Sequence, residues 1–357
     1  MRLGIIGLPN SGKTTIFNAL THSNLPTGAG SSGQMEIHTA VVNVPDERID
    51  RLSAMYKPKK TIYTQVTYVD IGGLDKGVSE GGLKGQLRNE LAQLDGFVHV
   101  ARAFEDENVP HPYGDVDAKR DVETLDTEFI LSDLLSVENR LGKIDDELRR
   151  KGRTTEAAIL GEQEVLLRIK EALESERPIR DLGLTEAEIK PLKGYGFLTL
   201  KPTLIVLNVD EASAGTTMTY EHEKSGVISL QGKIEAELAQ LPPEDAEIFM
   251  EEYGITELSA AKVIRMSYEI MDIQSFFTVG PDEVRAWNVA VGATAPEAAA
   301  AIHTDLQKGF IRAEVMAYDD LIELGSEQAM KQAGKLRLEG KEYVVKDGDI
   351  VHIRSGL

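Results

Sequence analysis

The chain has 357 residues, which suits two or three domains, and its 41% hydrophobic content is ordinary for globular folds with real cores. It contains no cysteine, which excludes disulfides, thiolate–zinc sites and thiol-based redox regulation. Its formal net charge of −20 argues against indiscriminate nucleic-acid binding, because such binding relies on Lys and Arg to neutralise phosphates. We therefore expect no binding to DNA.

Any contact with RNA would have to come from a local basic patch. The two candidate patches are Lys57, Lys59 and Lys60, and Arg149, Arg150, Lys151 and Arg153. The alternative is that these are solvated charges on a loop and at a helix end, and composition does not decide between the two. No apolar run approaches the roughly 18 residues of a membrane span, and the first predicted strand leaves no room for a signal peptide. We expect a cytoplasmic protein with no membrane partner.

The first predicted strand, residues 3–6, leads directly into a phosphate-binding motif. Gly7-Leu8-Pro9-Asn10-Ser11-Gly12-Lys13-Thr14 matches G-x-x-x-x-G-K-[ST], and a helix-compatible stretch follows it. In this context glycines let backbone N–H groups close around phosphates, and the helix N-terminus adds a positive dipole. Lys13 would reach the β and γ phosphates, and the Thr14 hydroxyl would hold Mg²⁺. The sequence therefore predicts a nucleoside triphosphate site, with phosphate-binding residues Asn10, Ser11, Gly12, Lys13, Thr14, Thr15 and Gly73.

The strand predicted at residues 65–71 ends in a second nucleotide motif. Asp70-Ile71-Gly72-Gly73 fits D-x-x-G, in which Asp70 would hold Mg²⁺ through water and the Gly73 amide would sense the γ-phosphate. Leu74 follows where many GTPases place a glutamine that orients the attacking water. Because an apolar side chain cannot do this, either hydrolysis is slow or another group supplies the polar contact.

The base-reading motif follows the strand predicted at residues 203–207. Asn208-Val209-Asp210-Glu211 stands where GTPases carry N-K-x-D, with valine in place of the lysine and glutamate at the fourth position. The aspartate of N-K-x-D accepts two hydrogen bonds from guanine, and a longer glutamate without the lysine should relax or abolish that preference. We favour ATP over GTP or no preference. The expected base-binding residues are Asn208, Val209, Glu211, Ser229 and Leu230.

The order of predicted elements indicates an α/β fold with an insertion. Further strands at residues 97–101 and 227–230 alternate with helices, which predicts a doubly wound, mainly parallel sheet with ligands at the carboxyl ends of its strands. Between residues 121 and 198, apolar side chains recur at spacings of three and four, which predicts two antiparallel helices in a coiled-coil seam. Such a seam is typical of simple packing, and a partner surface is the alternative. The seam residues are Leu134, Val137, Leu141, Ile144, Leu148, Ile159, Leu166, Ile169 and Leu173.

The pattern of predicted elements changes from about Phe276. Short strands are predicted at residues 284–289, 310–315, 341–346 and 350–353, with a turn at 346–349 and an alanine-rich helix at 296–303. These elements predict a small α+β module without catalytic features. The expected domains are residues 1–120 with 199–275 for nucleotide binding, 121–198 for the helical insertion, and 276–357 for the C-terminal module.

With these motifs in place, the chain resembles the YchF, or Obg-like ATPase, family of P-loop NTPases over nearly its whole length. The resemblance also rests on residues 70–74, 197–202, 233–237 and 309–314. It implies a coiled-coil arm, a C-terminal TGS domain of β-grasp, ubiquitin-like form, slow ATP hydrolysis, and association with the ribosome and its RNA through the arm and the TGS domain. The family's N-x-x-E element maps onto Asn208 and Glu211, and its catalytic histidine onto His111. Asn10 resembles an asparagine that binds K⁺ in related NTPases.

One region departs from the family pattern. The usual threonine of the first switch falls on Gln34, so a residue sensing Mg²⁺ and the γ-phosphate is missing there, and Thr39 would substitute only after a shift in register. Three functions remain open: a slow ATPase switch acting on the ribosome, an Obg-superfamily GTPase with a degenerate base motif, and a nucleotide-sensing binding protein with negligible hydrolysis. The first is favoured. We expect a monomer, because each domain can bury its own core.

Overall fold

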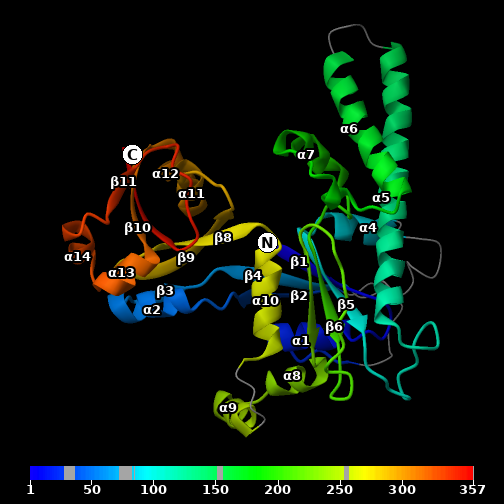
Figure 1. Cartoon of the computed structure of the whole chain (residues 1–357), viewed down its shortest axis with the longest axis horizontal. Helices are drawn as coiled ribbons and strands as arrows, with labels where there is room; N and C mark the ends of the chain where they lie inside the picture. Colours follow the sequence, from blue (N-terminus) through cyan, green and yellow to red (C-terminus); the bar gives the residue numbers. More distant parts are fainter. Residues whose placement is uncertain (28–36, 72–82, 84, 151–155, 253–256, 357) are drawn as a thin grey trace. The chain divides into compact units, whose positions relative to one another are not determined.

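The computed structural model describes residues 1–27, 37–71, 83, 85–150, 156–252 and 257–356 (Figure 1). Its contacts divide the chain into two compact units. The first comprises residues 1–42 and 67–270, and the second comprises residues 43–66 and 271–357. The sequence gives no sign that residues 43–66 pack with the C-terminal module.

The first unit is built on a sheet with strand order β2-β4-β1-β5-β6-β7 in the described part of the chain. All pairings from β4 to β7 are parallel. The strands are β1 (Arg2–Ile6), β2 (Ile37–Asn43), β4 (Gln65–Ile71), β5 (Gly96–Arg102), β6 (Thr203–Asn208) and β7 (Ser225–Leu230). Strands β5 and β6 are buried along their whole length, as expected for a parallel sheet covered on both faces.

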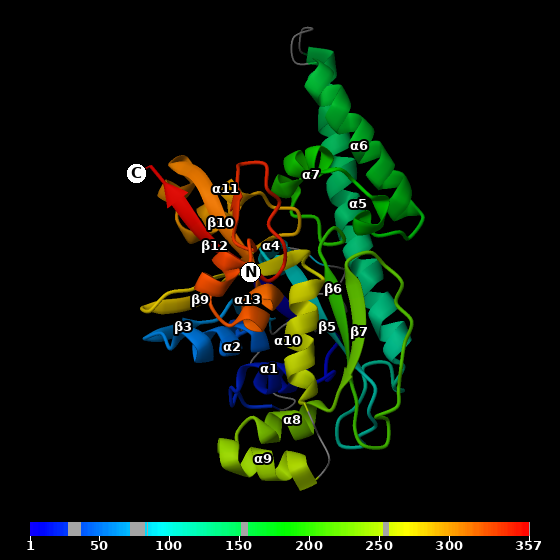
Figure 2. The same cartoon turned by 60° about the vertical axis from the view of Figure 1, so that its left-hand side comes forward.

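Helices cover both faces of this sheet (Figure 2). The helices of the first unit are α1 (Lys13–Thr21), α4 (Gly85–Ala92), α5 (Ala118–Arg150), α6 (Glu156–Glu174), α7 (Glu186–Leu192), α8 (Gly232–Leu238), α9 (Pro243–Glu252) and α10 (Ser259–Glu269), with 3₁₀ turns η1 (Ile179–Leu182) and η2 (Lys193–Tyr195). Leu87 and Leu91 of α4 and Leu125 and Phe129 of α5 join the strand side chains in one apolar core. Helices α1 and α10 pack together on the other face.

Helices α5 and α6 lie side by side and extend away from the sheet (Figures 1 and 2). Their contact is apolar, and it contains the side chains that the spacing of three and four selects. Val137 and Ile144 of α5 and Leu166 and Ile169 of α6 are completely buried in it. We call these two helices the helical arm. The short helix α7 begins with a capping box, in which Thr185 and Glu188 bond to each other's backbone N–H groups.

A buried carboxylate fastens the base of the arm to the chain that returns to the sheet. Asp133 of α5 is fully buried; its Oδ1 accepts from Leu198 N at 3.0 Å, and its Oδ2 accepts from Thr199 N and Thr199 Oγ1, both at 2.8 Å. Burial raises the pKa of Asp133 to about 6, and the three donors act against that rise. This contact gives Leu198 and Thr199, within the motif at residues 197–202, a structural role.

The second unit contains a sheet of order β11-β10-β12-β8-β9-β3 in the described residues. Its strands are β3 (Lys60–Ile62), β8 (Ile273–Thr278), β9 (Glu283–Ala290), β10 (Phe310–Ala317), β11 (Arg337–Glu339) and β12 (Asp349–Ser355). Its helices are α2 (Glu47–Tyr56), α11 (Ala295–Ile302), α12 (Thr304–Lys308), α13 (Tyr318–Leu324) and α14 (Glu327–Gln332). Ile49 and Leu52 of α2 are completely buried beside Phe277 and Val284, which explains why residues 43–66 belong to this unit.

The strand predicted at residues 341–346 of this unit is not present in the structure, so that prediction is wrong. Residues 341–346 form a turn and an extended segment with a single bridge between Val344 and Thr294, because the Tyr343 carbonyl and the Val345 amide bond to the start of α11 and the turn before it. The sequence also misses β8 and the short β11. The turn predicted at residues 346–349 is present, closed by a hydrogen bond from Asp349 N to Lys346 O. No helix in the described parts of either unit is long and apolar enough to cross a membrane.

The buried carboxylate at the base of the arm predicts a pH effect on stability. Because the folded-state pKa of Asp133 lies above its ordinary value, the folded chain holds this proton more tightly than the unfolded chain does. The resulting stability is complete below about pH 4 and is lost as the pH rises through 6. The free energy of unfolding of the wild type, relative to Asp133→Asn, should fall by about 2 kcal/mol between pH 4 and pH 7 in urea titrations. Asp145→Asn, at an exposed position of the same helix, should keep the wild-type profile, and a constant difference for Asp133→Asn would contradict the raised pKa.

Candidate nucleotide site

The phosphate-binding motif forms a tight loop between β1 and α1. Gly7 and Gly12 have φ angles of 148° and 91°, and Asn10 between them lies in the left-handed region at 60°. Space around the glycines is equally limiting: a Cβ atom at Gly7 would lie 2.3 Å from the Val100 carbonyl oxygen. The motif therefore needs glycine at these two positions for backbone reasons alone.

Two side chains at the start of α1 have the partners that phosphate chemistry requires. Lys13 Nζ donates to the carbonyl oxygens of Gly7 at 3.1 Å and Leu8 at 2.8 Å, so the ammonium group lies over its own loop. Thr14 Oγ1 donates to Asp70 Oδ2 at 2.8 Å. Strands β1 and β4 pair in parallel with Ile5 opposite Asp70, and this register brings the two motifs together. Thr15 follows on the helix and is half-buried.

Asn208 supports the loop from below. Its Nδ2 donates to the Ser11 carbonyl at 3.0 Å, and its Oδ1 accepts from Gly232 N at 3.2 Å. The side chain is buried, and a Cβ at Gly12 would lie 2.2 Å from its Nδ2. The sequence predicts that Asn208 contacts the nucleotide base. In the structure its side-chain amide links the phosphate loop to the start of α8.

The other expected base-binding residues lie at the ends of β6 and β7. Val209 is buried in an apolar cluster and its N–H donates to Leu230 O at 3.0 Å. Leu230 is buried as well, and Ser229 Oγ donates to Thr216 O at 2.9 Å. Glu211 is exposed, in the turn that follows. Among these residues it is therefore the carboxylate of Glu211 that is accessible from solvent.

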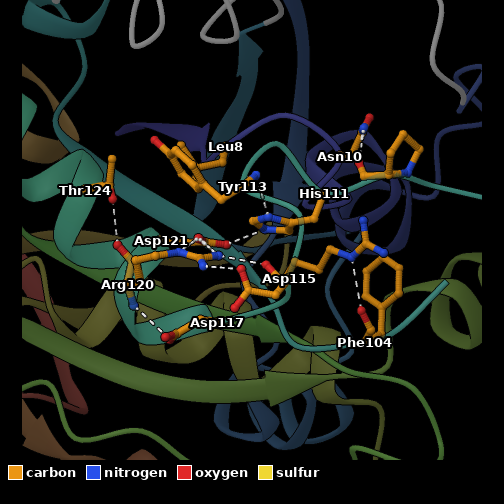
Figure 3. A network of polar contacts seen from close by, with 12 residues as sticks. Leu8, Asn10, Phe104, His111, Tyr113, Asp115, Asp117, Arg120, Asp121 and Thr124 are labelled. Carbon is orange, nitrogen blue, oxygen red and sulfur yellow. Dashed lines mark hydrogen bonds and ion pairs between the residues drawn. The ribbon is translucent and has the colours of Figure 1, made fainter. Parts of the chain in front are cut away.

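His111 lies in the loop between β5 and α5, beside the phosphate loop (Figure 3). Asn10 Nδ2 donates to the carbonyl of Pro110, the preceding residue, at 2.9 Å. A histidine between two prolines is typical of an exposed loop, yet only 3% of the His111 side chain is exposed, because Nε2 lies 2.8 Å from Asp121 Oδ2 at the start of α5. Asp121 is not among the predicted site residues; its only signal in the sequence is an acidic residue in the first turn of a helix.

A second histidine near the loop also escaped the sequence reading. His99 lies on β5, opposite Ile6 at the end of β1, and is almost completely buried. Burial, helped by the nearby charge of Lys13, lowers the pKa of His99 to about 3. This imidazole is therefore neutral at neutral pH and adds no charge beneath the phosphate loop.

Several expected residues lie outside the described residues: Gly72, Gly73 and Leu74, the altered first-switch segment that includes Gln34, and Lys151 and Arg153 of the second basic patch. Thr39 is described and lies exposed on β2. In the first basic patch, Lys59 forms an exposed ion pair with Asp282 at 2.8 Å, which favours the interpretation as solvated charge.

Comparisons with known proteins agree with this geometry. A family model described as "50S ribosome-binding GTPase" matches residues 2–140, and the model of the YchF GTPase C-terminal region, described as a protein of unknown function (DUF933), matches residues 273–356. The chain is 42% identical to the "Ribosome-binding ATPase YchF" of Haemophilus ducreyi over 99% of its own length and 98% of that protein. It belongs to the YchF family.

Other members extend this relationship to eukaryotes. The chain is 38% identical to "Obg-like ATPase 1" of Oryza sativa, covering 99% of its own length and 92% of that protein. The solved structure of the Schizosaccharomyces pombe YchF GTPase superimposes with a TM-score of 0.84 at 32% identity, covering 99% of this chain and 97% of that one. The predicted family is thus confirmed, and so is a P-loop nucleotide domain joined to a YchF C-terminal domain.

The hydrogen bond from Asn208 to the phosphate loop leads to a testable prediction. Asn208→Asp replaces the Nδ2 donor with a carboxylate oxygen facing the Ser11 carbonyl, so two acceptors meet in a buried place. We expect the free energy of unfolding to fall by about 2–3 kcal/mol in urea denaturation. Glu211→Gln, an exposed change in the neighbouring turn, should alter it by no more than about 0.5 kcal/mol. Equal stability of the two variants would show that Asn208 does not support the loop.

Proposed function

We propose that the chain is a slow ATPase that works as a nucleotide-dependent switch in association with the ribosome. The observation that carries the proposal is the meeting of Thr14 and Asp70 at the start of α1, beneath a loop crossed by the Lys13 ammonium. The names of the relatives add ATP hydrolysis and ribosome binding to this chemistry. A cytoplasmic, monomeric protein remains the expectation that goes with this function.

Mg²⁺ fits the oxygen donors of this site. Thr14 and Asp70 offer a hydroxyl and a carboxylate whose oxygens lie 2.8 Å apart, and such hard oxygen donors are what Mg²⁺ prefers. These two residues would hold the ion, the carboxylate through water. When bound, Mg²⁺ would neutralise charge on the phosphate groups. A K⁺ ion at Asn10 remains a weaker part of the proposal.

His111 is the proposed catalytic residue, with a neutral imidazole orienting the attacking water. This role is supported by the position of His111 in a loop whose Pro110 carbonyl accepts a hydrogen bond from Asn10 of the phosphate loop. In the sequence, Leu74 cannot orient water, so His111 is proposed as the polar group that supplies this contact in a slow hydrolysis. The alternative of a binding protein with negligible hydrolysis predicts that His111→Ala leaves ATP turnover unchanged.

The finer architecture follows the same proposal. The helical arm would be the family's coiled coil, supported by its continuous apolar seam. The C-terminal part of the second unit, from β8 to β12, would be a TGS domain of β-grasp form. Its first and last strands, β8 and β12, pair in parallel at the centre of the sheet. The core of that sheet packs against α11.

The names of the matches differ in the nucleotide: some contain GTPase and others ATPase. Because Asn208 is hydrogen-bonded to the phosphate loop and Val209 is buried, we propose that Glu211 determines which base is preferred. We expect calorimetry to show tighter binding of ATP than of GTP by the wild type. Glu211→Asp should shift the ratio toward GTP by about tenfold, because the shorter carboxylate restores the guanine register. Glu211→Gln, which lacks the carboxylate, should not. A wild type that prefers GTP would contradict the ATP assignment.

Ribosome contact through the arm predicts a surface effect. Leu160 and Leu167 lie two turns apart on α6 and are 46% and 53% exposed. We expect Leu160→Lys with Leu167→Lys to weaken co-sedimentation with ribosomes in ATP by about tenfold or more, since two apolar contacts would become charged. Ile248→Lys on α9, at an apolar position that is 64% exposed, is the control. Equal loss in both variants would remove the arm from the proposed contact.

A further inference from the structure

The two ring nitrogens of His111 have different partners. Nδ1 lies 3.2 Å from the backbone nitrogen of Tyr113, and Nε2 lies 2.8 Å from Asp121 Oδ2. A backbone N–H can only donate, so Nδ1 must carry the lone pair. Nε2 therefore carries the proton and donates it to the carboxylate. This arrangement defines a single tautomer of the imidazole.

The carboxylate of Asp121 is itself held in place, with a separate task for each oxygen (Figure 3). Its Oδ1 accepts from Arg120 Nη2 at 3.0 Å and Nε at 3.2 Å, which leaves Oδ2 for His111. Asp115 holds the far side of the same guanidinium, with Oδ1 2.8 Å from Arg120 Nη1. The Asp121 side chain is 3% exposed and stands in the first turn of α5, on a rigid element.

We propose that Asp121 is the positioning residue for His111, fixing the tautomer that keeps the Nδ1 lone pair available to the attacking water. The inference rests on the proposed role of His111 in ATP hydrolysis. In that step the water oxygen bonds to the γ-phosphorus as the bond to the bridging oxygen of ADP breaks. One water proton stays on the phosphate product and the other leaves to solvent, so the imidazole is unchanged at the end.

The loop that carries His111 borders a pocket, and its turn at residues 113 and 114 is exposed. A cavity of about 460 Å³ adjoins it, with Val109, Pro110 and His111 in its wall. The amide that occupies Nδ1 belongs to Tyr113, whose side chain is half exposed, and Gly114 follows with a φ of 89°. In the proposed step a water would take the place of this amide at Nδ1. The contact to Asp121 stays in place because it is anchored on the helix.

Arg120 makes the substitution Asp121→Asn decisive. Asparagine has one oxygen, and Arg120, which can only donate, will take it. The new NH₂ group then faces Nε2, which must become the acceptor. The proton moves to Nδ1, where it faces the Tyr113 N–H and can no longer accept a hydrogen bond from water. One change of oxygen to nitrogen thus inverts the tautomer without changing the size of the side chain.

The experiment measures steady-state ATP turnover of the full-length chain together with histidine ¹⁵N NMR. We expect Asp121→Asn to lower kcat by about tenfold or more, as far as His111→Ala does, with little change in KM. The NMR signal of His111 should change from the Nε2–H to the Nδ1–H tautomer, a readout that does not depend on turnover. Glu123→Gln, at an exposed position of α5 whose carboxylate pairs with Lys119, should keep kcat within about twofold.

A rescue variant separates tautomer control from damage to the fold. In Arg120→Ala with Asp121→Asn, the asparagine oxygen is free to face Nε2, so the Nε2–H tautomer and most of kcat should return. Wild-type turnover in Asp121→Asn, with His111→Ala impaired, would overturn the inference while leaving the proposed function in place. Failure of the double variant to regain turnover would also overturn it. Wild-type turnover in His111→Ala would instead remove the catalytic role of the histidine, on which the inference rests.

Discussion

The nucleotide site depends on one buried amide. Asn208 accepts from the first backbone N–H of α8 and donates to the carbonyl of Ser11, and so it joins the phosphate loop to the strand that ends beside it. The absence of a Cβ at Gly12 lets this amide approach the loop. A buried hydrogen bond is worth about 1 kcal/mol, but a buried polar group left without a partner costs more. Asn208 therefore fixes the loop chiefly because other loop conformations would leave its buried amide without partners.

Buried carboxylates do comparable work elsewhere in the first unit. Asp133 holds residues 198 and 199 at the base of the arm, and Glu235 accepts from Ser259 N at 2.9 Å and Ala260 N at 2.7 Å at the start of α10. Both carboxylates satisfy backbone N–H groups that would otherwise be buried without partners. In an acidic chain these residues look like further surface charge, but their role is internal.

The nucleotide site and the arm meet at the start of α5. Asp121, which holds His111, lies three turns before Asp133 on the helix that continues into the arm. A change in the position of α5 would therefore act on the histidine through a contact 2.8 Å long.

The sequence by itself determined what depends on neighbours along the chain. The phosphate loop, the strands around it, the capping box at Thr185 and the apolar seam of α5 and α6 all follow from local spacing, because period and turn chemistry are local properties. Only the tertiary structure decided which distant groups meet. It gave Asn208 a structural partner, placed residues 43–66 in the second unit, replaced a predicted strand at 341–346 with an extended turn, and paired His111 with Asp121. A hydrogen bond between a loop and a helix leaves no periodic trace in a sequence, so it becomes visible only when the fold brings its two atoms together.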